Sequence, residues 1–143
     1  MSIMKISFLI GRIIFGLYLL FNAFNHFSSN AMLAGYAASK GVPMPEVSVF
    51  IGGVLLTIAS LSILTGYKPK IGVAAMILFL LPVTFTMHAF WNDSDPMAKM
   101  GDMVNFMKNF ALIGAGLLMT AIPTPWQMSL DGRSQASLQV ATA

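Results

Sequence analysis

Hydrophobic positions along the chain fall into four long runs, and polar residues are concentrated in the short stretches between them. Each run has close to the ~20 residues that cross a ~30 Å hydrocarbon layer as an α-helix. None shows the alternation of apolar and polar residues that a membrane β-barrel strand requires. The pattern therefore predicts an all-α membrane protein, a four-transmembrane-helix bundle with helices over residues 6–24, 47–65, 71–90 and 104–122.

The stretches between the apolar runs carry turn residues. Gly66-Tyr67-Lys68-Pro69 predicts a tight hairpin, because Gly commonly ends a helix and Pro begins the next one. Residues 31–40 place Met32, Leu33 and Tyr36 at helical spacing, which predicts a short interfacial helix on the outer membrane surface. Residues 1–126 are thus predicted to form the transmembrane domain, and residues 127–143 a polar, flexible cytoplasmic tail.

Composition supports a membrane protein and excludes several other classes. Apolar residues make up 57% of the chain and charged residues 9%, against roughly 25% charged in a typical soluble domain. The absence of cysteine excludes disulfides and thiolate metal sites. The net charge is +3, but the basic residues are scattered singly, so nucleic-acid binding is not expected.

Lysine and arginine in short loops predict the orientation, because such loops remain preferentially in the cytoplasm. Lys5, Lys68, Lys70 and Arg133 all fall on one side of the predicted membrane. Both termini are therefore predicted to be cytoplasmic. The loops at residues 25–46 and 91–103 are predicted to face outward, which in a bacterium is the periplasm.

Polar residues in or near a membrane are costly unless they have partners, and here the predicted topology brings several to one level near the outer surface. Two histidines, three amides, one lysine and one tryptophan form this predicted outer cluster: Asn22, His26, His88, Trp91, Asn105, Lys108 and Asn109. A cation and imidazoles beside amides suit an anion or a carbonyl-bearing headgroup, so we expect a small-molecule site.

Structural interpretations of the same residues stand beside this one. The long side chain of Lys108 can extend its ammonium to the lipid headgroups. Each histidine can stabilise a helix C-terminus through the helix dipole. Arg12 is expected to be an anchor that extends to the inner surface or pairs with Asp131. Two histidines without recognisable ligand spacing predict no metal site, and no nucleophile or nucleotide motif identifies a catalytic residue.

Several motifs give the chain a resemblance to the DoxX family of small bacterial membrane proteins. They are Gly11-Arg12-Ile13, Gly41-Val42-Pro43-Met44-Pro45, Thr65-Gly66-Tyr67, His88-Ala89-Phe90-Trp91, the run at residues 105–115 and Ser129-Leu130-Asp131. The last two are most similar to the YphA-like members. Two positions differ: His26 stands where members often have Lys, and Leu56 where many have Glu.

The resemblance implies a multi-pass protein of the bacterial inner membrane that is linked to redox or oxidative-stress complexes. Quinone is the small molecule it implies, with Arg12, His88 and Lys108 at matching polar positions. Three functions stay open. The first is a non-catalytic subunit or anchor in the lipid bilayer, with a membrane or peripheral protein partner or a second copy. The others are a quinone- or lipid-binding component of a quinone-linked oxidoreductase, and a small oligomeric transporter.

Overall fold

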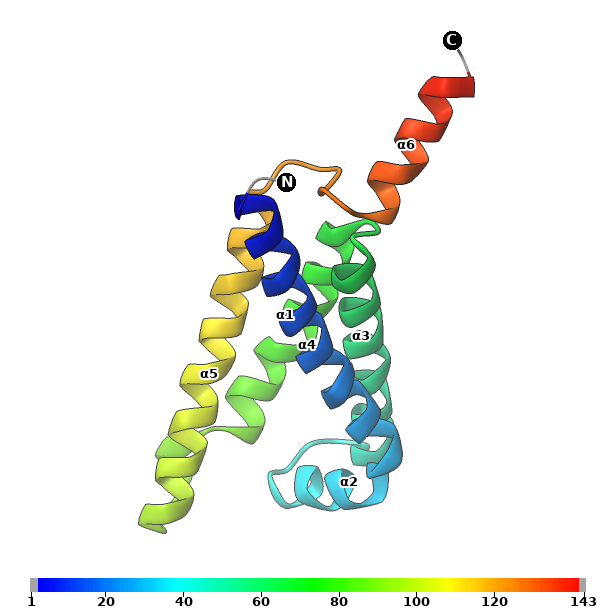
Figure 1. Ribbon diagram of the computed structural model, residues 1–143. Helices are drawn as coiled ribbons and strands as arrows, with labels where there is room; N and C mark the ends of the chain where they lie inside the picture. The colour runs from blue at the N-terminus through cyan, green and yellow to red at the C-terminus, as the bar shows by residue number, and fades with distance from the viewer. Residues whose placement is uncertain (1–2, 142–143) are drawn as a thin grey trace.

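A computed structural model describes residues 3–141, and these residues form helices and connections without a β-strand. In chain order the elements are α1 (Ile3–Ser28), α2 (Asn30–Ser39), α3 (Pro45–Thr65), α4 (Pro69–Met87), the 3-10 helix η1 (Phe90–Asn92), α5 (Pro96–Thr120) and α6 (Leu130–Ala141) (Figure 1). Four helical stretches among the described residues are long and apolar enough to cross a membrane: α1, α3, α4 continued to Asn92, and α5. The prediction of four transmembrane helices is therefore confirmed.

The start of α5 differs from the prediction. Residues 96–103, which we assigned to the outer loop, are already helical. Asp95 caps the helix, since its Oδ2 accepts a hydrogen bond of 2.8 Å from the Ala98 backbone N–H, and Pro96 occupies the first helical position. The charged residues of this stretch belong to a helix end rather than a loop.

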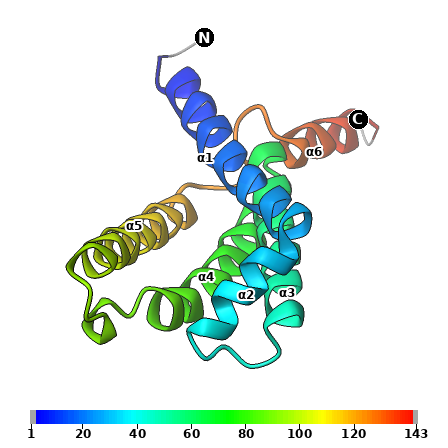
Figure 2. The same ribbon diagram turned by 90° about the horizontal axis from the view of Figure 1, so that it is seen from below.

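The membrane-spanning helices are packed as a row. α1 contacts α3, α3 contacts α4, and α4 contacts α5, whereas α1 and α5 have little contact with each other. The view along the bundle shows α5 standing apart from α1 (Figure 2). Buried apolar side chains between neighbouring helices form the core: Leu19, Ala23, Leu56, Ala59, Ile63, Val73, Ala75, Met76, Leu80 and Ile113.

The turn between α3 and α4 has the predicted hairpin form. Gly66 ends α3 in the left-handed region with φ 66°, and Lys68 precedes α4 with φ 46°. Left-handed backbone is costly for a residue with a Cβ, so Lys68 is held there by its surroundings. Its N–H donates a 2.8 Å hydrogen bond to Oδ2 of Asp131, at the start of α6.

Helices α2 and α6 lie outside the row. α2 packs on α3 through Ala34, Ala37 and Val49, so the predicted short helix exists, and its location at the membrane surface stays a prediction. α6 occupies most of residues 127–143, and the flexibility of this segment also stays a prediction. The beginning of α1 and the end of α6 lie at the same end of the molecule (Figure 1).

Candidate functional site

A network of charged side chains joins four elements at the end of the molecule opposite the termini. The ammonium of Lys40 lies 2.6 Å from Oδ2 of Asp102 and 3.2 Å from Oδ1 of Asp93. The Nδ1 atom of His88 lies 3.1 Å from Oδ1 of Asp102. We call these four residues the charged network. With neutral His88 it carries one cation and two anions, so its net charge is −1.

Helix ends position these groups. Lys40 follows the last turn of α2, His88 follows α4, and Asp93 follows η1. Asp102 comes from the second turn of α5 and is the centre of the network, because its two oxygens contact Lys40 and His88 separately. Its side chain is 9% exposed and that of Lys40 22%, so the pairs are shielded from water without being fully buried.

Two groups from α2 and its C-terminal end have raised pKa values beside the network. The hydrogen bond to Asp102 raises the pKa of Lys40 above its usual range, against an opposing effect of burial. Burial raises the pKa of Tyr36, and the nearby Asp102 carboxylate adds to the increase. Lys40 is therefore a fixed cation at neutral pH.

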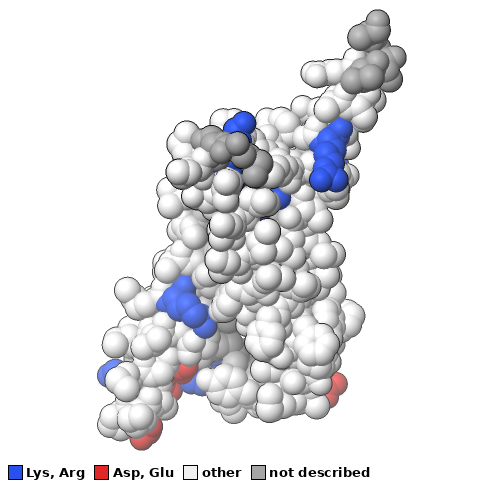
Figure 3. All heavy atoms as spheres, in the orientation of Figure 1, with Lys and Arg blue, Asp and Glu red and all other residues white. Residues whose placement is uncertain are grey.

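A polar hollow of about 420 Å³ adjoins the network. It is lined by Ser39, Lys40, Thr86, Ala89, Asn92 and Asp93. The second carboxylate oxygen of Asp93, Oδ2, is buried and has no hydrogen-bond partner. A buried acceptor without a partner is costly, so Asp93 is held in place by the rest of the network. Figure 3 shows acidic and basic atoms meeting in a recess near the lower end of the molecule.

Of the predicted outer cluster, only His88 belongs to the charged network. His26 instead packs between helices: its ring meets Phe79 edge-on at 5.3 Å, and a Cβ on Gly52 would lie 3.2 Å from its ring. Its Nδ1 is 2.8 Å from the backbone oxygen of Asn22, whose own side chain donates to the backbone oxygen of Tyr18. His26 and Asn22 thus have structural partners within α1 and across to α4.

The α5 members of the predicted outer cluster have local partners. Lys108 donates a 2.8 Å hydrogen bond to the side-chain oxygen of Asn105, one turn away, and remains exposed. Asn109 is buried, with 4% of its surface exposed. Trp91 is half exposed and meets the ring of Phe106 at 5.7 Å. The structure therefore divides the predicted cluster among several separate contacts.

The sequence-based prediction missed Lys40, Asp93 and Asp102. We placed Lys40 in the first outer loop, residues 25–46, and both aspartates in the second, residues 91–103. The dipeptide Asp95-Pro96 carried the missing signal, because an N-cap residue followed by Pro marks a helix start. A helix from Pro96 puts Asp102 and Asn109 seven residues apart on one face. Among the described residues, no group of three or more His, Cys, Asp or Glu is arranged to hold a metal ion.

At the opposite end, Arg12 joins α1 to the segment that follows α5. It is 3% exposed and donates hydrogen bonds to the backbone oxygens of Met128, at 2.8 Å, and Gln127, at 3.3 Å. Asp131 is not the partner of Arg12, because its carboxylate accepts from the Lys68 backbone N–H and Arg12 bonds to Gln127 and Met128 instead. The role of Arg12 as an anchor toward the inner surface stays a prediction. The segment after α5 folds over α1, where the buried Trp126 meets Phe8 edge-on at 5.1 Å.

These features define a small multi-pass helical membrane protein. The comparison with known families matches residues 7–89 to DoxX, and the chain belongs to the DoxX family. It is 35% identical over 98 residues to the inner membrane protein YphA of Escherichia coli (strain K12), which covers 68% of this chain and 69% of that protein. No solved structure matches the chain significantly. The protein is accordingly a multi-pass protein of the bacterial inner membrane.

Proposed function

We propose that this protein is a non-catalytic membrane subunit or anchor of a larger complex, of the redox-related kind that its family resemblance implies. The open row of helices carries the proposal. In the most apolar 18-residue window of α1 and of α5, 17% of residues are buried, against 39% in α3 and 33% in α4. A helix at the end of a row leaves most of its surface available for contact with lipid or with another protein.

The charged network supports the same function. Asp102 contacts both Lys40 and His88, so its carboxylate links α2, α4 and α5. Groups paired in this way act first as a structural clamp, and such networks shift pKa values without any catalytic role. Both termini on the cytoplasmic side would leave the clamp on the outer side.

Native mass spectrometry of the protein, extracted from its own membrane in mild detergent, tests this function. We expect a second polypeptide or a second copy of the chain, retained equally in a Lys108→Ala form because the hydrogen bond of Lys108 is to a neighbour on its own helix. A photoreactive residue at Leu118 of α5, which is 75% exposed, should cross-link to that partner. The same photoreactive residue at Leu78 of α4, which is 63% exposed, is the matched control. Because α4 lies inside the row rather than at its end, Leu78 should not cross-link to that partner. A protein that is always monomeric and never cross-links from Leu118 contradicts the proposal.

The polar hollow favours a second function, the binding of a quinone or lipid headgroup. Asp93 lines the hollow, and its carboxylate would accept a hydrogen bond from a ligand hydroxyl, such as that of a reduced quinone, or from an ammonium. In the same mass spectra, a bound species of quinone or lipid mass should then be lost in an Asp93→Asn form. Retention of every bound species in that form argues against a site in the hollow.

A further inference from the structure

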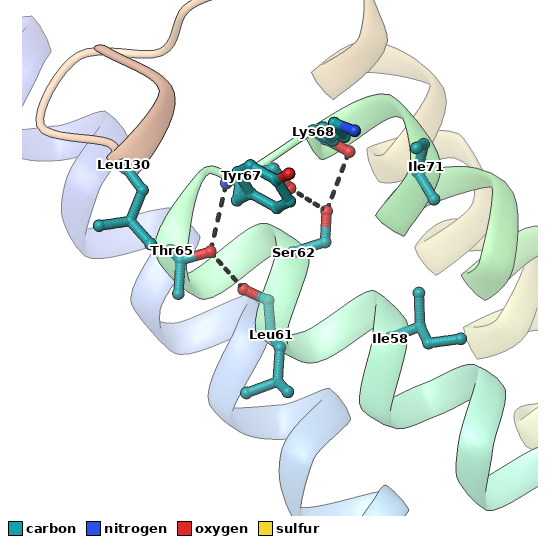
Figure 4. A pocket seen from close by; sticks show the side chains of 8 residues that line it. All are labelled: Ile58, Leu61, Ser62, Thr65, Tyr67, Lys68, Ile71 and Leu130. Carbon is teal, nitrogen blue, oxygen red and sulfur yellow. Dashed lines mark hydrogen bonds between the residues drawn. The ribbon is translucent and has the colours of Figure 1, made fainter. Parts of the chain in front are cut away.

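A groove lies where the end of α3, the beginning of α4 and the first residue of α6 meet (Figure 4). Its volume is about 290 Å³. Aliphatic side chains form the walls: Ile58 and Leu61 of α3, Ile71 of α4 and Leu130 of α6. The first three belong to membrane-spanning helices, so the groove opens toward hydrocarbon. Tyr67 and Lys68, in the turn between α3 and α4, stand at its polar end.

The side-chain hydroxyls of Ser62 and Thr65, which line the groove, are already satisfied by the protein. Ser62 donates to the backbone oxygen of Tyr67 at 2.7 Å. Thr65 donates to the backbone oxygen of Leu61 at 2.7 Å and accepts from the Tyr67 N–H at 3.2 Å. Figure 4 shows Thr65 bonded at the end of α3 and Ser62 bonded to backbone oxygens of the turn between α3 and α4. The groove therefore offers few polar partners to water and suits a hydrocarbon chain.

The Lys68 ammonium is the charge at the polar end. It lies 5.3 Å from the centre of the Tyr67 ring and makes no ion pair with any described residue. Asp131, the nearby acid, is held by the backbone N–H of Lys68 instead. The surroundings are basic as well, since Lys70 lies in the first turn of α4 and Arg133 in the first turn of α6. Figure 3 shows basic atoms at the upper end of the molecule. A cation without a carboxylate partner beside an apolar groove is complementary to a phosphate attached to an acyl chain.

We propose that this groove binds one phospholipid with an anionic headgroup, with an acyl chain between Ile58 and Ile71 and the phosphate beside Lys68. The Asp131 carboxylate holds the left-handed backbone of Lys68, which sets where its side chain leaves the turn. Leu130 forms one wall of the groove, so the bound lipid also contacts the first turn of α6. The site is at the opposite end of the molecule from the charged network and is independent of the proposed subunit role.

Lipid titration of the whole, delipidated protein in mild detergent tests the proposal by native mass spectrometry. Phosphatidylglycerol and phosphatidylcholine with identical acyl chains are the two probes. We expect the first bound lipid to be phosphatidylglycerol by about fivefold, the preference that one lysine at a membrane surface provides. Lys68→Asn should remove this preference, since asparagine accepts the left-handed backbone but carries no charge. Lys70→Asn, an exposed neighbour outside the groove, should keep it.

A second pair of variants tests the groove itself. Ile58→Trp should fill the groove and lower the retention of both lipids severalfold. Ile51→Trp, seven residues earlier on the same face of α3 and also exposed, should leave retention unchanged. The proposal is overturned if Lys70→Asn loses as much preference as Lys68→Asn, which would indicate a general attraction to a basic surface. It is equally overturned if Ile58→Trp retains phosphatidylglycerol as the unmodified protein does.

Discussion

Replacing Asp102 with Asn removes the carboxylate that contacts both Lys40, at 2.6 Å, and His88, at 3.1 Å. The side-chain volume is nearly unchanged, and the amide oxygen still accepts one hydrogen bond. Lys40 keeps only its 3.2 Å contact with Asp93. The substitution therefore tests the charge of Asp102 with little effect on packing.

The expected loss follows from the two hydrogen bonds. A hydrogen bond to a charged group contributes about 1.5–3 kcal/mol to the free energy of unfolding. In Asp102→Asn, a weaker hydrogen bond to the amide oxygen replaces one of the two bonds to the carboxylate. The side chains of Asp102 and Lys40 are 9% and 22% exposed, so water screens some of the remainder. We expect a loss of about 2 kcal/mol, which for a chain of this size lowers the Tm by about 6 °C.

Thermal unfolding in detergent, followed by tryptophan fluorescence, measures this shift. Asp95→Asn is the matched control, because asparagine caps a helix as well as aspartate and the Tm should change by less than about 1 °C. A double-mutant cycle with Lys40→Met should give a coupling energy above about 0.5 kcal/mol. Equal shifts for Asp102→Asn and Asp95→Asn would refute the reasoning. They would mean that the cost of removing these charges from water cancels their attraction.

Three further predictions concern other contacts. Gly16→Ala should lower the Tm, because a Cβ there would lie 2.5 Å from Cγ of Leu64, whereas Gly11→Ala, with nothing within 4 Å, should raise it slightly through helix propensity. Arg12→Met should speed limited proteolysis of residues 121–129, because it removes both bonds to this segment, and Lys5→Met should not. The Tm difference between the unmodified protein and Lys40→Met should be the same at about pH 7.5 and about pH 9. The folded-state pKa of Lys40 is raised, so its stabilisation is lost only at higher pH.

The sequence predicted the transmembrane helices well, because an apolar run of ~20 residues has few alternatives to a membrane helix. The hairpin at Gly66 and Pro69 was equally predictable from residue type. The beginning of α5 was not, since its charges resembled a loop and outweighed the cap at Asp95. Hydropathy locates a helix along the chain and gives no direct information about which neighbours it has.

The candidate site was predicted less well for that reason. We placed His26 and Lys108 at the same depth near the outer surface. Residues at the same depth can still belong to helices that do not touch. The row order separates them, because His26 belongs to α1, Lys108 to α5, and these helices have little contact. Lys40 and Asp102 meet only because α2 ends beside the first turns of α5, a tertiary contact that spans 62 positions. His88 joins the network because it follows the end of α4, which packs against α5.

The contact between Arg12 and Gln127 has a consequence for the order of events during synthesis. The two residues are 115 positions apart, so Arg12 enters the membrane long before its hydrogen-bond acceptors exist. At ~5–20 residues per second the interval is roughly 6–23 s. During that time the guanidinium requires water or lipid phosphates, which are available only at the membrane surface. We therefore expect the first helix made to be the last to reach its final depth, once Met128 has left the ribosome.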